Sequence, residues 1–199
     1  RPQMIPDILS RNVHEIGIHG WIHERLPVLN DEKEEQRLLD QSIETLTKAM
    51  GKRPVGYRAP SWKFSNYTLA QVKAAGFLYD SSLMASDDAY EINLDGKPTG
   101  LVELPIERIV DDAPYFGAAD GSMPSPEHVL EVFQSEFDVA WDERGLYVLT
   151  MHPHYMGHRS RVAILDRLIT HMKGKGGVWF ATHEDIAKHV KGMLDAGTN

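Results

Sequence analysis

The 199-residue sequence predicts an α/β fold with a mostly parallel sheet. Stretches with helical periodicity alternate along the chain with short apolar runs, which are typical of buried strands. Polar clusters follow four of these runs, and their leading residues are His19 with His23, Arg58, Asp80 and His152. The carboxyl ends of parallel strands meet at one edge of a sheet, where α/β proteins gather their functional groups. The sequence therefore predicts a functional site at that edge.

Composition narrows the class of protein. With 42% hydrophobic and 25% charged residues, the chain suits one globular domain, which we expect over residues 1–199. A formal net charge of −8 argues against a nucleic-acid binder. No apolar run approaches the roughly 18 residues that a membrane span needs, and no signal peptide is visible. Because cysteine is absent, any bound metal must take nitrogen and oxygen ligands.

The first part of the chain supplies most of the expected strand ends. Residues 4–12 have the pattern of a helix end, and they lead into a short strand at about 13–18. A charged helix is expected at about 31–50, because Gly51 can stop it and its apolar residues share one face. That face consists of Leu38, Leu39, Ile43, Leu46 and Met50. A strand at about 54–58, a helix at 67–75 begun by Ser65 or Asn66, and a short strand at 77–79 follow.

The second part begins with an irregular segment, residues 84–124, in which Leu101–Ile109 has the pattern of a strand or hairpin arm. Ser125-Pro126 is an N-cap and N1 pair for a helix to about 143. Its inward residues should be Val129, Leu130, Phe133, Phe137 and Trp141. The remaining expected elements are a buried strand at 146–151, a helix at 160–173, a strand at 178–180 and a final helix capped by Thr182.

Two histidines, His19 and His23, follow the first expected strand at a spacing of four. This spacing puts both imidazoles on one side of a helical turn or tight loop, close enough to share one cation. A third ligand must then come from elsewhere and leave one position open for water or substrate. An isolated pair at this spacing is equally compatible with ordinary surface or capping histidines.

The order of four short motifs resembles one known family. These motifs are His-Gly-Trp-Ile-His at 19–23, Arg-Ala-Pro at 58–60, Asp-Ser-Ser at 80–82 and Met-His-Pro at 151–153. Together they resemble the polysaccharide deacetylase family, carbohydrate esterase family 4, also called the NodB-type domain. The resemblance covers about residues 10–190 of this chain. Three further stretches, 111–116, 157–161 and 179–184, look like an intracellular subgroup. That subgroup includes peptidoglycan-deacetylase-like proteins, allantoinases and cyclic imidases.

The resemblance implies a distorted (β/α) barrel and a hydrolase of non-peptide carbon–nitrogen bonds. It implies removal of an acetyl group from an N-acetylated amino sugar, with a divalent metal held by one Asp and two His. By resemblance, His19 and His23 match the metal histidines; Zn²⁺ suits such ligands best, with Co²⁺ or Ni²⁺ as substitutes. The subgroup also implies a cytoplasmic homo-oligomer that acts on a carbohydrate or a small amide.

Three residues match the family's catalytic positions. His152 matches the general acid that protonates the leaving amine; the alternative is a capping or packed histidine. Arg58 matches an arginine that pairs with the catalytic aspartate; the alternative is a surface arginine before a turn. Asp80 matches the aspartate that orients the general-acid histidine, although an aspartate before two serines is also a common turn.

Four further residues are candidates for binding substrate. Pro60 and Trp62 follow the Arg58 strand. Trp62 could line a substrate groove; packing in the core is the equal alternative. Asp111 and Asp112 are adjacent carboxylates that could support the site or bind a substrate hydroxyl; a solvated loop pair is the alternative.

The chain departs from the family in its first motif. In the family, an Asp-Asp strand end upstream of the histidine pair supplies the catalytic base and the third metal ligand, and nothing before Val13 resembles it. We therefore expect this chain to be the C-terminal two-thirds to three-quarters of the domain, with the N-terminal strands missing and an open barrel edge. A longer protein is the favoured explanation; a second chain that supplies these parts and a non-catalytic remnant are the alternatives.

Two other functions compete with the deacetylase. One is a cyclic amide hydrolase that opens an imide or ureide ring, and the other is an inactive module that only binds glycans. Allantoinase-like relatives tend to lose the metal ligands, whereas this chain keeps His19 and His23. The sequence therefore favours the metal-dependent deacetylase.

Overall fold

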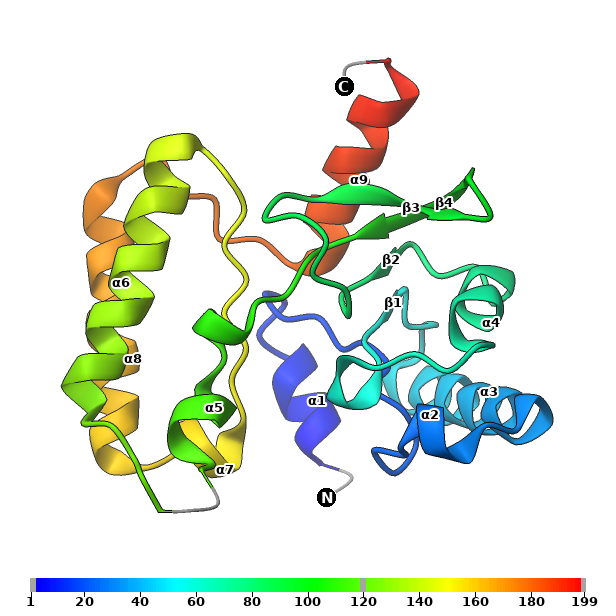
Figure 1. Ribbon diagram of the computed structural model, residues 1–199, viewed down its shortest axis with the longest axis horizontal. Helices are drawn as coiled ribbons and strands as arrows, with labels where there is room; N and C mark the ends of the chain where they lie inside the picture. The colour runs from blue at the N-terminus through cyan, green and yellow to red at the C-terminus, as the bar shows by residue number, and fades with distance from the viewer. Residues whose placement is uncertain (1–2, 119–120, 198–199) are drawn as a thin grey trace. The chain divides into compact units, whose positions relative to one another are not determined.

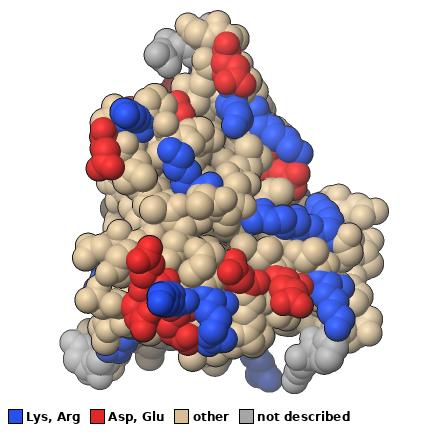
Figure 2. All heavy atoms as spheres, turned by 90° about the vertical axis from the view of Figure 1, so that its right-hand side faces the viewer, with Lys and Arg blue, Asp and Glu red and all other residues tan. Residues whose placement is uncertain are grey.

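The computed structural model describes residues 3–118 and 121–197, which divide into two units (Figure 1). Unit 1 takes in the described residues of Arg1–Leu83, Ala89–Leu104 and Ala181–Asn199. Unit 2 takes in Met84–Asp88 and the described residues of Pro105–Phe180. Among the described residues, no helix is both long enough and apolar enough to cross a bilayer. Acidic and basic side chains are interspersed over the face that Figure 2 shows.

Unit 1 contains a four-stranded sheet with the strand order β1-β2-β4-β3. Strands β1 (Gly56–Tyr57), β2 (Tyr79–Asp80) and β4 (Lys97–Glu103) run parallel, and β3 (Tyr90–Leu94) pairs antiparallel with β4. Ile18 extends the sheet beside β1 through a parallel bridge to Tyr57. The carboxyl ends of Ile18, β1 and β2 therefore lie at the same edge of the sheet, as the sequence predicts for these three, and β4 ends there too.

The helices of unit 1 are α1 (Met4–Leu9), α2 (Leu26–Leu29), α3 (Glu32–Met50), α4 (Thr68–Ala74) and α9 (His183–Asp195). A 3-10 turn, η1 (Pro60–Trp62), follows β1. The predicted boundaries of α3 are confirmed: the Asp31 side chain accepts hydrogen bonds at its start, and Gly51 ends it with φ of 73°. Thr182 caps α9 as predicted, because its hydroxyl accepts from the amide of Asp185.

The helices of unit 2 are α5 (Asp112–Phe116), α6 (Pro126–Glu143), α7 (Pro153–Met156) and α8 (Arg159–Lys175), with a 3-10 turn, η2 (Arg108–Val110). Ser125 caps α6 as predicted. Four of the predicted inward residues of α6 join the buried core of this unit: Val129, Leu130, Phe133 and Phe137. Trp141 does not, since 38% of it is exposed and its indole N–H donates to the carbonyl of Gly176.

The predicted strands at 146–151 and 178–180 are wrong for the part of the chain that the structure describes. Only Thr150 makes a strand-like contact, a parallel bridge to Asp111. Trp179 and Phe180 are 59% and 54% exposed. An apolar run becomes a strand only where a second strand offers its backbone groups, and the run alone does not reveal that partner.

The segment predicted as irregular, 84–124, contains the hairpin of β3 and β4. Its turn is Asp95-Gly96, and both residues have positive φ, 52° and 71°. A two-residue turn of this kind matches the twist of the strands it joins, so the pair Asp-Gly is a strong hairpin signal. The predicted α/β class is confirmed, with a partial sheet.

Candidate functional site

The loop after Ile18 brings His19 and His23 together. Their ring centroids lie 5.1 Å apart in an edge-to-face arrangement. Gly20 and His23 have left-handed φ values, and the carboxylate of Glu24 closes the loop by accepting hydrogen bonds from the amides of Trp21 and Ile22. The predicted proximity of the two imidazoles is therefore present within this short loop.

The ring of His19 is held in one tautomer. Its Nδ1 lies 2.8 Å from the carbonyl oxygen of Arg58. Because a carbonyl only accepts hydrogen bonds, Nδ1 must carry a proton, and in the neutral ring Nε2 then keeps its lone pair. Metal-binding histidines are commonly oriented in this way by a hydrogen bond from the other ring nitrogen. The two imidazoles thus fit a divalent cation that takes nitrogen ligands, such as Zn²⁺, Co²⁺ or Ni²⁺.

Arg58 lies beside the loop that follows β2. Its Nε donates to the carbonyl of Ser81 at 2.8 Å, and its guanidinium donates to the Ser81 hydroxyl at 2.6 Å. The Nε2 of His183, the first residue of α9, lies 3.4 Å from the same guanidinium. Burial, and then the positive charge of Arg58, lower the pKa of His183 to about 4. His183 is therefore neutral near pH 7 and accepts from Arg58.

We expect stability to fall as the pH falls from about 6.5 towards 4, because His183 gains its proton more readily in the unfolded chain. The loss from this residue should reach about 3 kcal/mol at most. Urea unfolding from about pH 7 to about pH 4.5 would measure it in the parent and in His183→Gln, which keeps an acceptor for Arg58. The raised pKa values of other buried acids act with the opposite sign in both proteins, so the difference between the curves isolates His183. Parallel curves down to about pH 5 would contradict the prediction.

Asp80 lies in a fully buried acid pair. It is in register with Glu103 across β2 and β4, and both residues have 0% exposure. Its carboxylate accepts hydrogen bonds from the amide and the hydroxyl of Ser82, each at 2.9 Å. Burial raises the pKa of both Asp80 and Glu103. The described partners of Asp80 are thus within unit 1, and the carboxylates described against His152 are those of Asp111 and Asp112.

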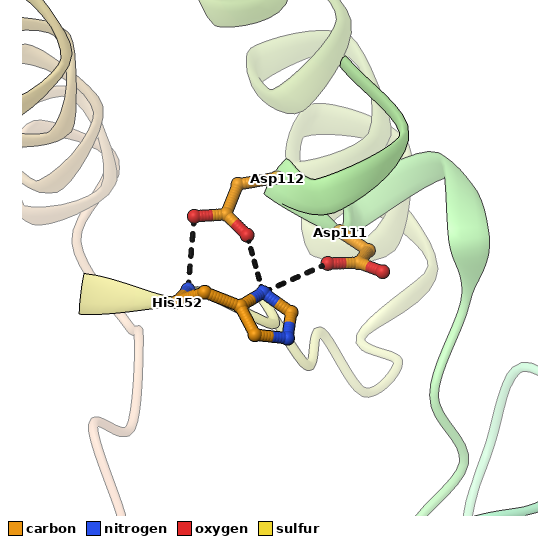
Figure 3. Close-up of side chains that lie close together, drawn as sticks. All are labelled: Asp111, Asp112 and His152. Atoms are coloured by element: carbon orange, nitrogen blue, oxygen red, sulfur yellow. Dashed lines mark hydrogen bonds and ion pairs between the residues drawn. The ribbon is translucent and has the colours of Figure 1, made fainter. Parts of the chain in front are cut away.

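In unit 2, Asp112 holds His152 at two points (Figure 3). Asp112 accepts from the His152 amide at 2.9 Å, and its other oxygen lies 2.6 Å from Nδ1 of the ring. Asp111 lies 3.6 Å from the same nitrogen. The bridge between Asp111 and Thr150 places the two segments side by side. Asp112 is fully buried, whereas 35% of the His152 side chain is exposed.

This arrangement suits a proton-transfer histidine. Asp112 accepts at both carboxylate oxygens, so Nδ1 of His152 carries a proton and Nε2, which points away from both aspartates in Figure 3, can exchange one. Among the described residues, Asp111, Asp112 and His152 are also the one cluster of three potential metal ligands. A cation bound at Nδ1 would have to displace the short hydrogen bond to Asp112. The geometry therefore favours acid–base chemistry over metal binding at His152.

Comparison with known proteins agrees with the family that the motifs resemble. Residues 1–79 match the sequence model of a family described as polysaccharide deacetylase. The solved structure of a Mycobacterium smegmatis protein classed as a polysaccharide deacetylase is 36% identical, with a TM-score of 0.87 over 97% of this chain and 68% of that one. The chain belongs to the polysaccharide deacetylase family. The predicted enzyme class, a hydrolase that acts on carbon–nitrogen bonds, is confirmed at this level.

Two more relatives of this chain carry the names of the two branches of the predicted subgroup, peptidoglycan deacetylase and allantoinase. A peptidoglycan deacetylase from Helicobacter pylori is 29% identical over 203 residues, which are 87% of this chain and 69% of that protein. The solved structure of Puue allantoinase is 27% identical, with a TM-score of 0.84 over 95% of this chain and 62% of that one. The chain thus spans about two thirds of the length of each of these three proteins.

The residues predicted to bind substrate differ in how deeply they are buried and in what they contact. Pro60 is buried, and its ring fills the space beside Gly20, where an added Cβ would lie 2.7 Å from the Pro60 Cγ. Trp62 is half-buried and has a left-handed φ of 56°. Asp112, for which the sequence suggests a supporting or a substrate-binding role, uses both carboxylate oxygens on His152. A substrate-binding role for these residues and for Asp111 stays a prediction.

Sequence reasoning missed two residues of this region, Glu103 and His183. Glu103 lay in a segment predicted to be a strand or hairpin arm, and its charge gave no sign of burial. His183 lies in the stretch 179–184, which in the sequence indicates only the subgroup. Both act through residues far away in the sequence, so only the fold could reveal them.

Proposed function

We propose that this chain is part of a metal-dependent deacetylase that removes acetyl groups from an N-acetylated amino sugar of the polysaccharide or peptidoglycan type. The observation that carries the proposal is the His19–His23 loop. Its two rings lie 5.1 Å apart, and the hydrogen bond to Arg58 leaves Nε2 of His19 with its lone pair. The name of the Helicobacter pylori relative supports the choice of substrate class.

In this proposal His19 and His23 hold the cation, most simply Zn²⁺. Such a cation polarises an amide carbonyl and lowers the pKa of bound water. Arg58 fixes the ring of His19 through its backbone carbonyl. Its guanidinium is held by Ser81 and His183, so the arginine is anchored rather than mobile.

His152 is the proposed proton donor to the leaving amine. Asp112 fixes its tautomer through the 2.6 Å contact to Nδ1, which leaves Nε2 as the nitrogen that gives up a proton. The orienting role that the family resemblance suggested for Asp80 thus passes to Asp112 in this proposal.

A cyclic amide hydrolase is the second candidate, and the likeness to allantoinase favours it. Both reactions cleave an amide C–N bond, but only the deacetylase releases acetate. Parallel assays of acetate release from an N-acetylated amino sugar and of ring opening of an imide or ureide separate the two candidates. Cytoplasmic location and homo-oligomeric assembly stay predictions.

Metal content tests the proposal. We expect the full-length gene product to carry about one zinc per chain, and the double variant His19→Ala/His23→Ala to carry almost none. The matched control is His128→Ala/His158→Ala, which removes two other exposed histidines and should keep the metal. Elemental analysis after dialysis measures all three proteins. Metal retained by the His19→Ala/His23→Ala protein, or absent from the parent after loading with Zn²⁺ or Co²⁺, would contradict the proposed site.

A further inference from the structure

The buried pair Asp80–Glu103 has a hydrogen-bonding pattern that fixes where its protons lie. Both oxygens of Asp80 accept from Ser82, one from its amide and one from its hydroxyl. Oε1 of Glu103 accepts from the amides of Ser82 and Leu83, each at 2.9 Å. Oε2 of Glu103 is buried and accepts from none of the described donors.

A proton on Glu103 accounts for this pattern. Asp80 and Glu103 are register partners on neighbouring strands, and two ionised carboxylates would repel each other strongly in this fully buried position. Burial, and then the negative charge of Asp80, raise the pKa of Glu103 well above its usual range. Glu103 is therefore the protonated member of the pair and can donate to Asp80, which is ionised and accepts the two hydrogen bonds from Ser82.

From Asp80 the hydrogen bonds continue to His19 without a break. The Ser82 hydroxyl donates to Asp80 and accepts from the amide of Ala59, at 2.8 Å. The same peptide group has the carbonyl of Arg58 at its other end, and that carbonyl accepts from Nδ1 of His19. Every link runs in one direction: His19 donates to the 58–59 peptide, the peptide donates to Ser82, and Ser82 donates to Asp80.

We propose that Glu103, Asp80 and Ser82 are positioning residues for His19, which they hold through the 58–59 peptide as the Nδ1–H tautomer. The buried negative charge at Asp80 polarises the serine and then the peptide, so the Arg58 carbonyl becomes a stronger acceptor. A stronger acceptor makes Nε2 of His19 more basic and therefore a better ligand. The proposal rests on the proposed role of His19 as a cation ligand.

Ser82→Ala is the first test, because it removes one hydroxyl from the middle of the network. We expect the affinity for Zn²⁺, measured by calorimetry, to fall about tenfold or more. In the metal-free protein, the ring ¹⁵N signals of His19 should change from a single Nδ1–H tautomer to a mixture. Ser42→Ala is the matched control: Ser42 is also a buried serine of unit 1, but its hydroxyl donates to Leu38 within α3. It should leave the affinity and the ring signals unchanged.

Two isosteric amides test the proton assignment. Glu103→Gln can still accept at one atom and donate to Asp80 at the other, so its Zn²⁺ affinity should stay within about threefold of the parent value. Asp80→Asn places a donor NH₂ where Asp80 accepts from Ser82, so this hydrogen bond is lost. Its affinity for Zn²⁺ should therefore fall about tenfold or more. A merely structural role would lower the melting temperature without changing the His19 tautomer.

The two proposals fail in different ways. If the parent binds no Zn²⁺, the metal-dependent function is overturned, and the ring signals of the metal-free protein still decide the network. A folded Ser82→Ala protein that keeps the parent's His19 tautomer would overturn the network. If Asp80→Asn does not fold, Ser82→Ala and Glu103→Gln give the decision.

Discussion

Replacing His152 with alanine should lower kcat for acetate release from an N-acetylated amino sugar by about 10²–10⁴-fold, the usual contribution of a positioned general acid. KM should change little, because the proposed role is proton donation rather than binding. Steady-state kinetics on the full-length gene product measure both constants. His154→Ala is the matched control, since His154 is a neighbouring exposed histidine whose ring centroid lies 4.1 Å from that of Tyr155 at a tilt of 47°. A His152→Ala enzyme with kcat within about threefold of the parent would show that another group donates the proton.

The partner of His152 gives a second, independent test of the same step. Asp112→Asn keeps the shape of the side chain, but one of its two acceptor oxygens becomes a donor NH₂. It cannot accept from both the amide and Nδ1 of His152, so the ring loses the tautomer that presents its proton. We expect kcat to fall by about 10²-fold in Asp112→Asn, with the fold kept intact. The double variant with His152→Ala should be no slower than His152→Ala alone, because Asp112 acts through that ring.

The helices could be predicted from the sequence because their signals are local. Asp31, Ser125 and Thr182 each cap a helix within three residues of the amides they bind, and Gly51 ends its helix by its own left-handed φ. The strands were harder to predict. The apolar run at 146–151 has a period and a composition typical of strands, yet strand formation depends on a partner elsewhere in the chain.

The same distinction holds for the site. The rule that polar groups follow parallel strands correctly placed His19 next to Arg58, where the ring of one meets the carbonyl of the other. The rule could not say which acid meets which histidine. Asp112 reaches His152 across 40 residues of sequence, and adjacent carboxylates in a loop look the same whether buried or solvated. The burial of Glu103 could not be predicted for the same reason, because it depends on the register between β2 and β4.

Gly56→Ala should destabilise the chain by about 3 kcal/mol or more, because the added methyl group has no space. A Cβ at Gly56 would lie 1.8 Å from Cζ of Tyr79 and 2.1 Å from its hydroxyl oxygen. The ring of Tyr79 cannot easily move aside, since its hydroxyl donates to Glu15 at 2.7 Å and its centroid lies 5.5 Å from that of the His183 ring. Urea unfolding measures the change. Gly192→Ala, at an open position in α9, is the control and should stabilise by about 0.5–1 kcal/mol.

This clash matters for the site because Gly56 and Tyr79 are register partners in β1 and β2. Their close approach fixes the position of β1 relative to β2. The same register, continued by two residues, brings Arg58 to Ser81. A shift of β1 that makes room for the methyl group should therefore also disturb the 58–59 peptide and weaken Zn²⁺ binding at His19. Gly56→Ala combined with Tyr79→Ala should cost less than the sum of the two single changes, because Tyr79→Ala removes the ring that the methyl group meets. If the Gly56→Ala protein has the same midpoint of urea unfolding as the parent, the pairing of Gly56 with Tyr79 is wrong.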